Sequence, residues 1–340
     1  MRTYQTFSHK TKVARLASGL CCLLIIAALL SIIIGSVPLQ LQDVLTTLQA
    51  PLDVTNPTSI ILYNIRIPRL IGAIFAGAAL SVAGLLLQTL LNNPLASPSI
   101  VGLNSGAALG AVLMFTFFPY AYEYIPLLAT SCGFLTTLLV FFISRAAGGS
   151  RLSIILAGIA LSNIISAILD LIAIFLPESK LSATSFLIGN LAGITPEQLT
   201  FPITYIIIGL VIAFFLAPRL NILMLGDETA HSLGLNLKRT RLLIIAIATL
   251  LAGSAISYCG LLSFIGLLIP HVIRLLVGTN HMHTLALSAL GGSTFLVICD
   301  LLVRLFFAPY EVPVGILLAF LGGPFFIYLL ISSRKTASLS

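Results

Sequence analysis

The sequence predicts an all-α polytopic membrane protein whose ten transmembrane helices form two inverted repeats. Of its 340 residues, 59% are hydrophobic and 8% are charged, whereas a soluble domain has roughly 45–50% apolar and about 25% charged residues. Long apolar runs alternate with proline, glycine or charge, and about 20 apolar residues are enough to cross a bilayer. The same composition argues against nucleic-acid binding, despite the net charge of +7.

The apolar runs define the expected spans. The first run follows basic residues, as in a signal peptide, but it is longer than a typical signal core and lacks a clear small-residue cleavage site. We therefore interpret it as the first spanning helix. The eighth run, with 14 residues, is short for a full crossing. The ten expected spans are residues 16–37, 67–91, 98–118, 124–145, 152–176, 199–217, 240–262, 264–277, 284–308 and 313–332.

The second span, 67–91, is rich in small residues, which let neighbouring helices approach closely where lipid supplies no hydrophobic drive. This helix should therefore pack against protein. It should end before Pro94, because proline removes a helix donor and biases the preceding residue out of the α region. The next helix should begin near Pro98 or Ser99. The small residues are Gly72, Ala76, Gly77, Ala79, Ser81, Ala83 and Gly84.

The distribution of basic residues predicts the orientation. With the N-terminus inside, thirteen of the seventeen Lys and Arg residues fall on the cytoplasmic side, as the excess of positive charge in cytoplasmic loops requires. Both termini are therefore expected in the cytoplasm. The four basic residues on the outer side are Arg66, Arg69, Lys180 and Arg304.

An internal repeat links the two parts of the chain. The segment AGAALSVAGLL at 76–86 matches AGSAISYCGLL at 252–262, with seven of eleven residues identical, and the same offset of 176 maps Pro94 onto Pro270. In the predicted topology the second span runs inward and the seventh runs outward. The copies are therefore inverted, which is common in transporters.

No soluble domain is expected, because the longest polar stretches are the outer loop 38–66 and the inner loop 218–241. We expect residues 1–340 to form a single transmembrane domain. Its first half covers 16–176 and its second half covers 199–332.

The inner loop 218–241 should contain a short helix. Asp227 can cap its N-terminus, Glu228 falls in its first turn, and Gly234 suits its C-terminal stop. A capped helix outside the membrane is typical of a docking element. A solvated amphipathic connector is the alternative interpretation.

Three outer arginines are candidates for binding acidic groups. Arg66 and Arg69 lie three residues apart, on one helix face, at the outer end of the second span, and Arg304 lies at the outer end of the ninth. Arginine pairs well with carboxylates. The alternative is that these arginines only anchor the helices by extending their side chains to the membrane interface. Asp300 precedes Arg304 by four residues, so an intrahelical pair could hold that arginine in place.

The remaining titratable residues point to less specific sites. Asp170, Asp300 and His271 are the candidates for an ion-coupled secondary transporter or, less well, for a membrane enzyme, although no HExxH or GxSxG motif supports the latter. We interpret His271 as a structural histidine at a helix start, and His281 and His283 as solvated loop residues. We expect no metal site and no cofactor.

The cysteines lie in apolar runs without CxxC or metal-ligand spacing, and we interpret them as small buried hydrophobic residues. The five are Cys21, Cys22, Cys132, Cys259 and Cys299. The sequence also lacks a GxxxxGK[ST] phosphate-binding segment, so any ATP hydrolysis would belong to a partner.

Specific motifs along nearly the whole chain make it resemble the FecCD-type permease subunits of bacterial ABC importers, which carry ferric siderophores, haem or cobalamin. The motifs are RIPR at 66–69, NNPLASP at 92–98, GLNSGA at 102–107, GDETAHSLG at 226–234, GLLSFIGLLIPHVIR at 260–274, DLLVR at 300–304 and EVPVGILLAFLGGPFF at 311–326.

The resemblance implies a type II ABC importer permease in the bacterial cell membrane. It implies a dimer of ten-helix subunits, identical or related, each bound to a cytoplasmic ATPase, with a substrate-binding protein docking outside. In such a protein Arg66, Arg69 and Arg304 would receive acidic residues of the binding protein. The ATPase coupling helix would contain Gly226, Asp227, Glu228, Ala230, Leu233 and Gly234.

The resemblance also implies a transport path and a substrate class. The path would be lined or gated by residues near Asn163–Ile174, Ala183–Leu191 and Pro313–Pro324. A ferric siderophore is the favoured substrate, with haem and cobalamin as alternatives. An ion-coupled secondary transporter remains the alternative mechanism.

Overall fold

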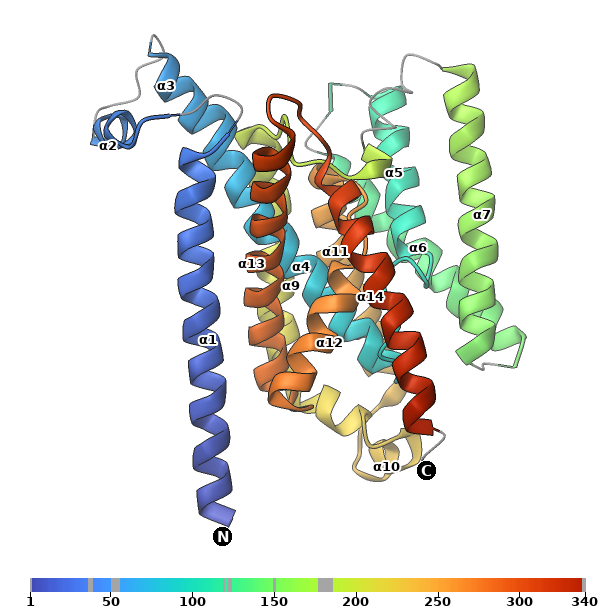
Figure 1. Ribbon diagram of the computed structural model, residues 1–340. Coiled ribbons are helices and arrows are strands. Elements are labelled where there is room, and N and C mark those ends of the chain that lie inside the picture. The colour runs from blue at the N-terminus through green and yellow to red at the C-terminus, as the bar shows by residue number, and fades with distance from the viewer. Residues whose placement is uncertain are drawn as a thin grey trace.

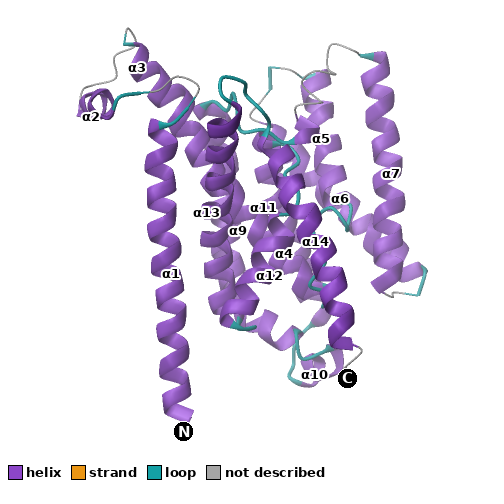
Figure 2. Cartoon of the chain, in the orientation of Figure 1, coloured by secondary structure: helices purple, strands orange, loops and turns teal. Residues whose placement is uncertain are grey.

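The computed structural model describes residues 2–35, 39–49, 56–118, 120–121, 124–148, 151–176 and 186–337, and all of its regular elements are helices (Figure 2). They are α1 (Arg2–Ile33), α2 (Leu41–Gln49), α3 (Pro57–Ile60), the π-helical turn η1 (Ile61–Arg66), α4 (Ile67–Leu90), α5 (Leu103–Phe117), α6 (Ile125–Ala146), α7 (Arg151–Phe175), α9 (Pro196–Leu223), α10 (Asp227–Ser232), α11 (Leu237–Cys259), α12 (Ile265–Val277), α13 (His281–Phe307) and α14 (Val314–Ala337).

The predicted spans are confirmed as helices. Within the described residues, seven helices are long and apolar enough to cross a membrane, and three shorter apolar helices, α5, α12 and the first part of α14, bring the number to ten. The start of α5 differs from the prediction, because residues 98–101 form turns and the helix begins at Leu103. Gly102 precedes it with φ +72°, a left-handed conformation that glycine adopts without steric cost.

The predicted outer loop 38–66 contains more helix than expected. The helix α2 lies within it, and α3 and η1 continue directly into α4, so that the second span runs from Pro57 to Leu90. Asn56 begins this helix by accepting a hydrogen bond from the Thr58 amide at 2.9 Å. The prediction from apolar runs covered only the part of this helix that follows Arg66.

The helix α4 lies at the centre of the molecule, packed against α9, α11, α12 and α13 (Figure 1). A Cβ atom at Gly84 would overlap the carbonyl oxygen of Gly266 in α12, and one at Gly77 would overlap that of Gly292 in α13. Three helix backbones therefore touch at positions where only glycine fits. The prediction that the small residues of this span pack against protein is confirmed.

The two halves of the structure have the same order of helices, but the residues that the sequence repeat pairs do not occupy equivalent positions in them. The run α4 to α7 has 24, 15, 22 and 25 residues, and the run α11 to α14 has 23, 13, 27 and 24. The offset of 176 is wrong in detail. Gly84 lies inside α4 whereas Gly260 ends α11 with φ +69°, and Pro94 lies in a turn whereas Pro270 lies inside α12.

The bundle has two ends (Figure 1). We call the end that carries Arg66, Arg69 and Arg304 the arginine end, and the end that carries α10 the α10 end. The chain enters α4 at the arginine end and enters α11 at the α10 end, so the two repeats run in opposite directions. Both chain termini lie toward the α10 end.

We expect Gly84→Ala to destabilise the protein, because the added methyl group would force α4 and α12 apart. Overpacking of this kind costs about 1–3 kcal/mol. Gly19→Ala, in α1, is the matched control, because no atom lies within 4 Å of its added Cβ. Thermal unfolding of the detergent-purified protein measures both variants. Equal unfolding temperatures for the two would contradict the close contact.

Candidate docking and transport sites

Two of the outer arginines share one buried carboxylate. Asp300 lies in α13 between Arg69 of α4 and Arg304, and its Oδ1 accepts hydrogen bonds from Arg69 Nε at 3.0 Å and Nη2 at 2.9 Å. Arg304 Nε lies 3.1 Å from Asp300 Oδ2, one turn away on the same helix. The expected intrahelical pair is therefore confirmed, and it also holds α4 against α13.

The same arginines bind the C-terminal end of α1. Arg304 Nη1 donates to the carbonyl oxygens of Ser31 at 3.0 Å and Ile34 at 2.9 Å. Arg66 Nη1 donates to the carbonyl oxygens of Ile33, at 2.7 Å, and Ile32. The last carbonyls of a helix lack intrahelical partners and attract cations. Arg66 and Arg304 therefore anchor α1, whose remaining contacts with the bundle are mainly with α13.

The three arginines are buried, with 4–7% of their surface exposed. The sequence placed them correctly at one end of the bundle but did not reveal that their guanidinium groups already have partners. Glu311 is the accessible member of the cluster. Its side chain is 47% exposed, and its Oε2 accepts from Arg69 Nη1 at 3.1 Å. A docking role for the arginines remains a prediction.

The loop at the α10 end contains the expected short helix, α10. Its N-cap is Gly226 rather than Asp227. Asp227 is the first helical residue, and its carboxylate pairs with Arg241 of α11 at 2.7 Å rather than capping the helix. Gly234 ends the helix as predicted: its φ is +81°, and the Leu235 and Gly234 amides donate to the carbonyls of Ala230 and His231.

The two faces of α10 differ in exposure. Ala230 is fully buried against the bundle, whereas Leu233 is 58% exposed. A cavity of about 560 Å³ lies beside the helix, between the end of α4 and the segment 223–229. An apolar side chain at the end of α10 is therefore exposed, while the helix itself packs against α9 and α11.

Two histidines occupy places that the sequence did not predict. His281 is the first residue of α13 and is 2% exposed, not solvated, because its ring bridges Thr89 Oγ1 and Asn221 Oδ1 at 2.8 Å each. His271 lies inside α12 rather than at its start, with its ring edge-on to Phe325. Among the described residues no group of His, Cys, Asp or Glu has the arrangement of a metal site.

A second polar contact lies near the α10 end of α4. Gln88 Nε2 donates to the Gly266 carbonyl at 2.9 Å, and Gln88 Oε1 accepts from Arg274 of α12. These bonds hold α12 against α4 next to the contact of Gly84 with Gly266.

The cysteines are only partly as expected, since Cys259 and Cys299 are buried but Cys21 and Cys22 are exposed on α1.

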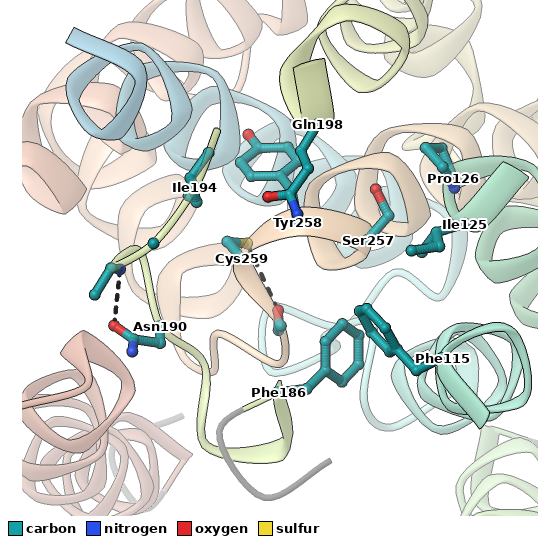
Figure 3. Close-up of a pocket in the computed structure, with 13 residues that line it drawn as sticks. Phe115, Ile125, Pro126, Phe186, Asn190, Ile194, Gln198, Ser257, Tyr258 and Cys259 are labelled. Carbon is teal, nitrogen blue, oxygen red and sulfur yellow. Dashed lines mark hydrogen bonds between the residues drawn. The ribbon is translucent and has the colours of Figure 1, made fainter. Parts of the chain in front are cut away.

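A cavity of about 350 Å³ lies near the arginine end, between α5, α6, α9 and α11 (Figure 3). Tyr258 and Ser257 of α11 project toward it, and Phe115 packs edge-on against Phe186 with ring centres 5.9 Å apart. The other residues that line it are Ile125, Pro126, Asn190, Ala192, Gly193, Ile194, Gln198, Cys259 and Gly260.

The segment 186–190 connects this cavity to α14. The Phe186 carbonyl accepts from the Leu261 amide at 2.9 Å, and the Gly189 carbonyl accepts from the Gly315 amide at 3.1 Å. It therefore bridges the end of α11 and the start of α14. Of the predicted path segments, Asn163–Ile174 lies on α7 and Pro313–Pro324 begins α14, whereas residues 183–185 of the third lie outside the described residues.

We expect Asp300→Asn to destabilise the fold strongly, because it leaves Arg69 and Arg304 buried without the carboxylate that neutralises both. Breaking a buried pair costs about 3–5 kcal/mol. Asp227→Asn is the matched control, since it removes a surface pair worth about 0–1 kcal/mol. Thermal unfolding in detergent measures both. Similar losses in the two variants would show that the buried cluster is not structurally required.

The chain matches the model of the FecCD transport family over residues 23–332. It is 36% identical to the Fe(3+)-citrate import system permease protein YfmE of Bacillus subtilis, over 92% of this chain and 93% of that one. It is 36% identical to the Fe(3+) dicitrate transport system permease protein FecD of Escherichia coli, over 90% and 95%. The hemin transport system permease protein HmuU of Yersinia pestis is 35% identical, over 81% and 84%.

A solved structure of an ABC transporter described as of the metal-chelate type, in an inward-facing conformation, superimposes with a TM-score of 0.81 and 31% identity, covering 94% of this chain and 99% of that one. The family match over residues 23–332 includes both helix repeats and the α10 loop between them. The chain belongs to the FecCD transport family.

Proposed function

We propose that this protein is the permease subunit of an ATP-driven importer that moves a metal chelate into the cytoplasm, with ferric siderophores as the favoured class and haem or cobalamin as alternatives. The match to the family over residues 23–332 carries the proposal. The relatives named above import iron citrate or hemin, so the metal-chelate class is common to them.

In the proposed complex the α10 end faces the cytoplasm and binds the ATPase. The exposed Leu233 and the first turn of α10, with Asp227 and Glu228, would enter a groove of that partner. The pairing of Asp227 with Arg241 would pass its movement to α11, which packs against α4. Because the chain has no phosphate-binding loop, hydrolysis belongs to the partner.

At the other end, the substrate-binding protein would dock over the arginine cluster. Arg69 is reached through Glu311, the only half-exposed group in the cluster formed by Arg66, Arg69, Asp300, Arg304 and Glu311. An acidic side chain of the binding protein would compete with Glu311 for Arg69. In this proposal a carboxylate of the binding protein replaces the Glu311 carboxylate beside Arg69. Because Glu311 precedes α14, docking would act on the start of that helix.

The alternative of an ion-coupled transporter loses one of its candidate residues. Asp300 is held between Arg69 and Arg304, whose two guanidinium groups already neutralise its carboxylate, so it offers a coupling cation no free ligand. Asp170, on α7, remains as a candidate for this alternative. An uptake that an ionophore abolishes and that needs no ATPase would favour this alternative.

Purification in mild detergent with mass spectrometry of the associated proteins tests the proposal. We expect an ATP-binding subunit in equal amount. Leu233→Asp should reduce the retained ATPase by at least about tenfold, as for a residue at the centre of an interface. Met282→Asp, 49% exposed at the start of α13, is the control and should retain it. A folded permease that never carries an ATPase would contradict the proposal.

We expect Glu311→Gln to tighten docking of the binding protein, because it removes the carboxylate that competes for Arg69. A half-exposed pair is worth up to about 1 kcal/mol, so the gain should be at most about fivefold and should shrink at high salt. Glu311→Asp keeps the charge and is the control. Binding to the permease in nanodiscs measures the affinity. Weaker docking of Glu311→Gln would mean that Glu311 itself contacts the partner.

A further inference from the structure

One histidine joins the ends of three helices at the α10 end of the bundle. His281 is the first residue of α13, Asn221 lies in the last turn of α9, and Thr89 lies in the last turn of α4. The ring Nδ1 and the main-chain nitrogen of His281 lie 2.8 and 3.0 Å from Asn221 Oδ1, and the ring Nε2 lies 2.8 Å from Thr89 Oγ1. We call these three residues the histidine link.

Both ring nitrogens of His281 are used in the link. Asn221 Oδ1 is a carbonyl oxygen and can only accept, so Nδ1 carries a proton and donates to it. Nε2 then accepts from the Thr89 hydroxyl when the ring is neutral, or donates to it when the ring is protonated. Water has little access to these bonds, because His281 is 2% and Thr89 is 1% exposed.

The link holds the part of α9 that leads into α10. Pro218 lies inside α9, one turn before Asn221, and a proline there removes one intrahelical hydrogen bond. Beyond Asn221 the chain continues in hydrogen-bonded turns as far as Gly226, the N-cap of α10. The segment from residue 219 to α10 is therefore able to move as a unit relative to the rest of α9.

The histidine link is the directional contact of α9 with its neighbours. Among the described residues, Asn221 makes the only side-chain hydrogen bonds between α9 and another helix. The buried residues of α9, which packs against α4, α11 and α13, are all apolar. Apolar contacts have no preferred direction, and helices packed through them slide past each other. The link fixes the position of the α9 end where the apolar contacts alone do not.

The helices α4 and α13 run antiparallel and are joined at three levels. Arg69 pairs with Asp300 at 2.9 Å near the arginine end, Gly77 touches the backbone of α13 near the middle, and the histidine link joins the two helices at the α10 end. Arg69 and Thr89 are 20 residues apart, about 30 Å along a helix at 1.5 Å per residue. The link therefore connects the α10 segment with a helix pair that reaches the arginine cluster.

We propose that His281 is a positioning residue of the transporter, which passes the movement of α10 to the α4–α13 pair and through this pair to the arginine end. The inference rests on the proposed function, in which an ATPase moves α10, and it names a connection between that movement and the docking site of the binding protein. The pair of Asp227 with Arg241 is a weaker connection, because it is exposed to water.

Hydrogen exchange of the permease alone tests the link. Asn221→Leu removes the acceptor of both bonds, whereas Asn221→Asp keeps an oxygen that accepts both and is the matched control. The His281 amide is itself a donor in the link. Exchange at the start of α13, followed by mass spectrometry, should therefore be at least about tenfold faster in Asn221→Leu and close to wild type in Asn221→Asp. Equal exchange in the two variants would overturn the link.

Hydrogen exchange of the complex with its ATPase, with and without ATP and vanadate, tests the transmission of movement. In the wild type, the nucleotide should change exchange both at residues 219–226 and at the arginine end of α13. In Asn221→Leu, the change at 219–226 should persist and the change at the arginine end should be lost. A change at both places in this variant would overturn the proposed role of His281.

Two substitutions of His281 separate its hydrogen bonds from its size. His281→Asn places an amide donor near the position of Nδ1 and keeps the side-chain bond to Asn221, whereas His281→Gln reaches toward Thr89 and loses that bond. The response at the arginine end should therefore be nearer to wild type in His281→Asn. Glutamine is closer to histidine in size, so the opposite order would show that the ring only fills space and would overturn the proposal.

Failure of the proposed function is distinguishable from failure of this inference. A permease that carries no ATPase, or whose α10 segment does not respond to ATP, would contradict the ATP-driven function and the role of His281 in it, whereas exchange in the permease alone still decides whether the link exists. An α10 segment that responds to ATP, with the arginine end responding equally in Asn221→Leu, would uphold that function and overturn only the role of His281.

Discussion

The contact of bare helix backbones around α4 is the constraint on which the structure depends. At Gly77 and Gly84 this helix touches the backbones of α13 and α12, and the facing residues, Gly292 and Gly266, are also glycines. In lipid, where apolar burial gives little drive for helix association, such close packing supplies the stabilisation. The elements that cover α4 on its remaining sides, α9 and α11, are positioned by the same core.

The same helix connects the two ends at which partners are proposed to bind. Arg69 near its start joins the charged cluster with Asp300, and Gln88 and Thr89 near its end bond to α12 and to His281. A helix held at both ends and along its length moves as part of a rigid body. Inverted repeats that rock as rigid bodies around a central route produce alternating access. The family resemblance predicts that α7 and α14 line that route.

Composition and hydropathy were enough to predict ten helices and most of their boundaries, because a span needs a long apolar run whatever its neighbours are. The partners of the charged residues were not predictable. Arg69 and Asp300 are 231 residues apart, and only the packing of α4 on α13 brings them together. His281 was mistaken for a loop residue for the same reason, since its partner Asn221 comes from α9. The turn chemistry of Gly234 is local and was predicted correctly.

The most direct test of the account is a cryo-electron microscopy structure of the complex purified through this chain and placed in lipid nanodiscs. We expect two permease subunits, with the α10 helix of each seated on an ATP-binding subunit. A complex in which α10 contacts no partner would contradict the proposed function.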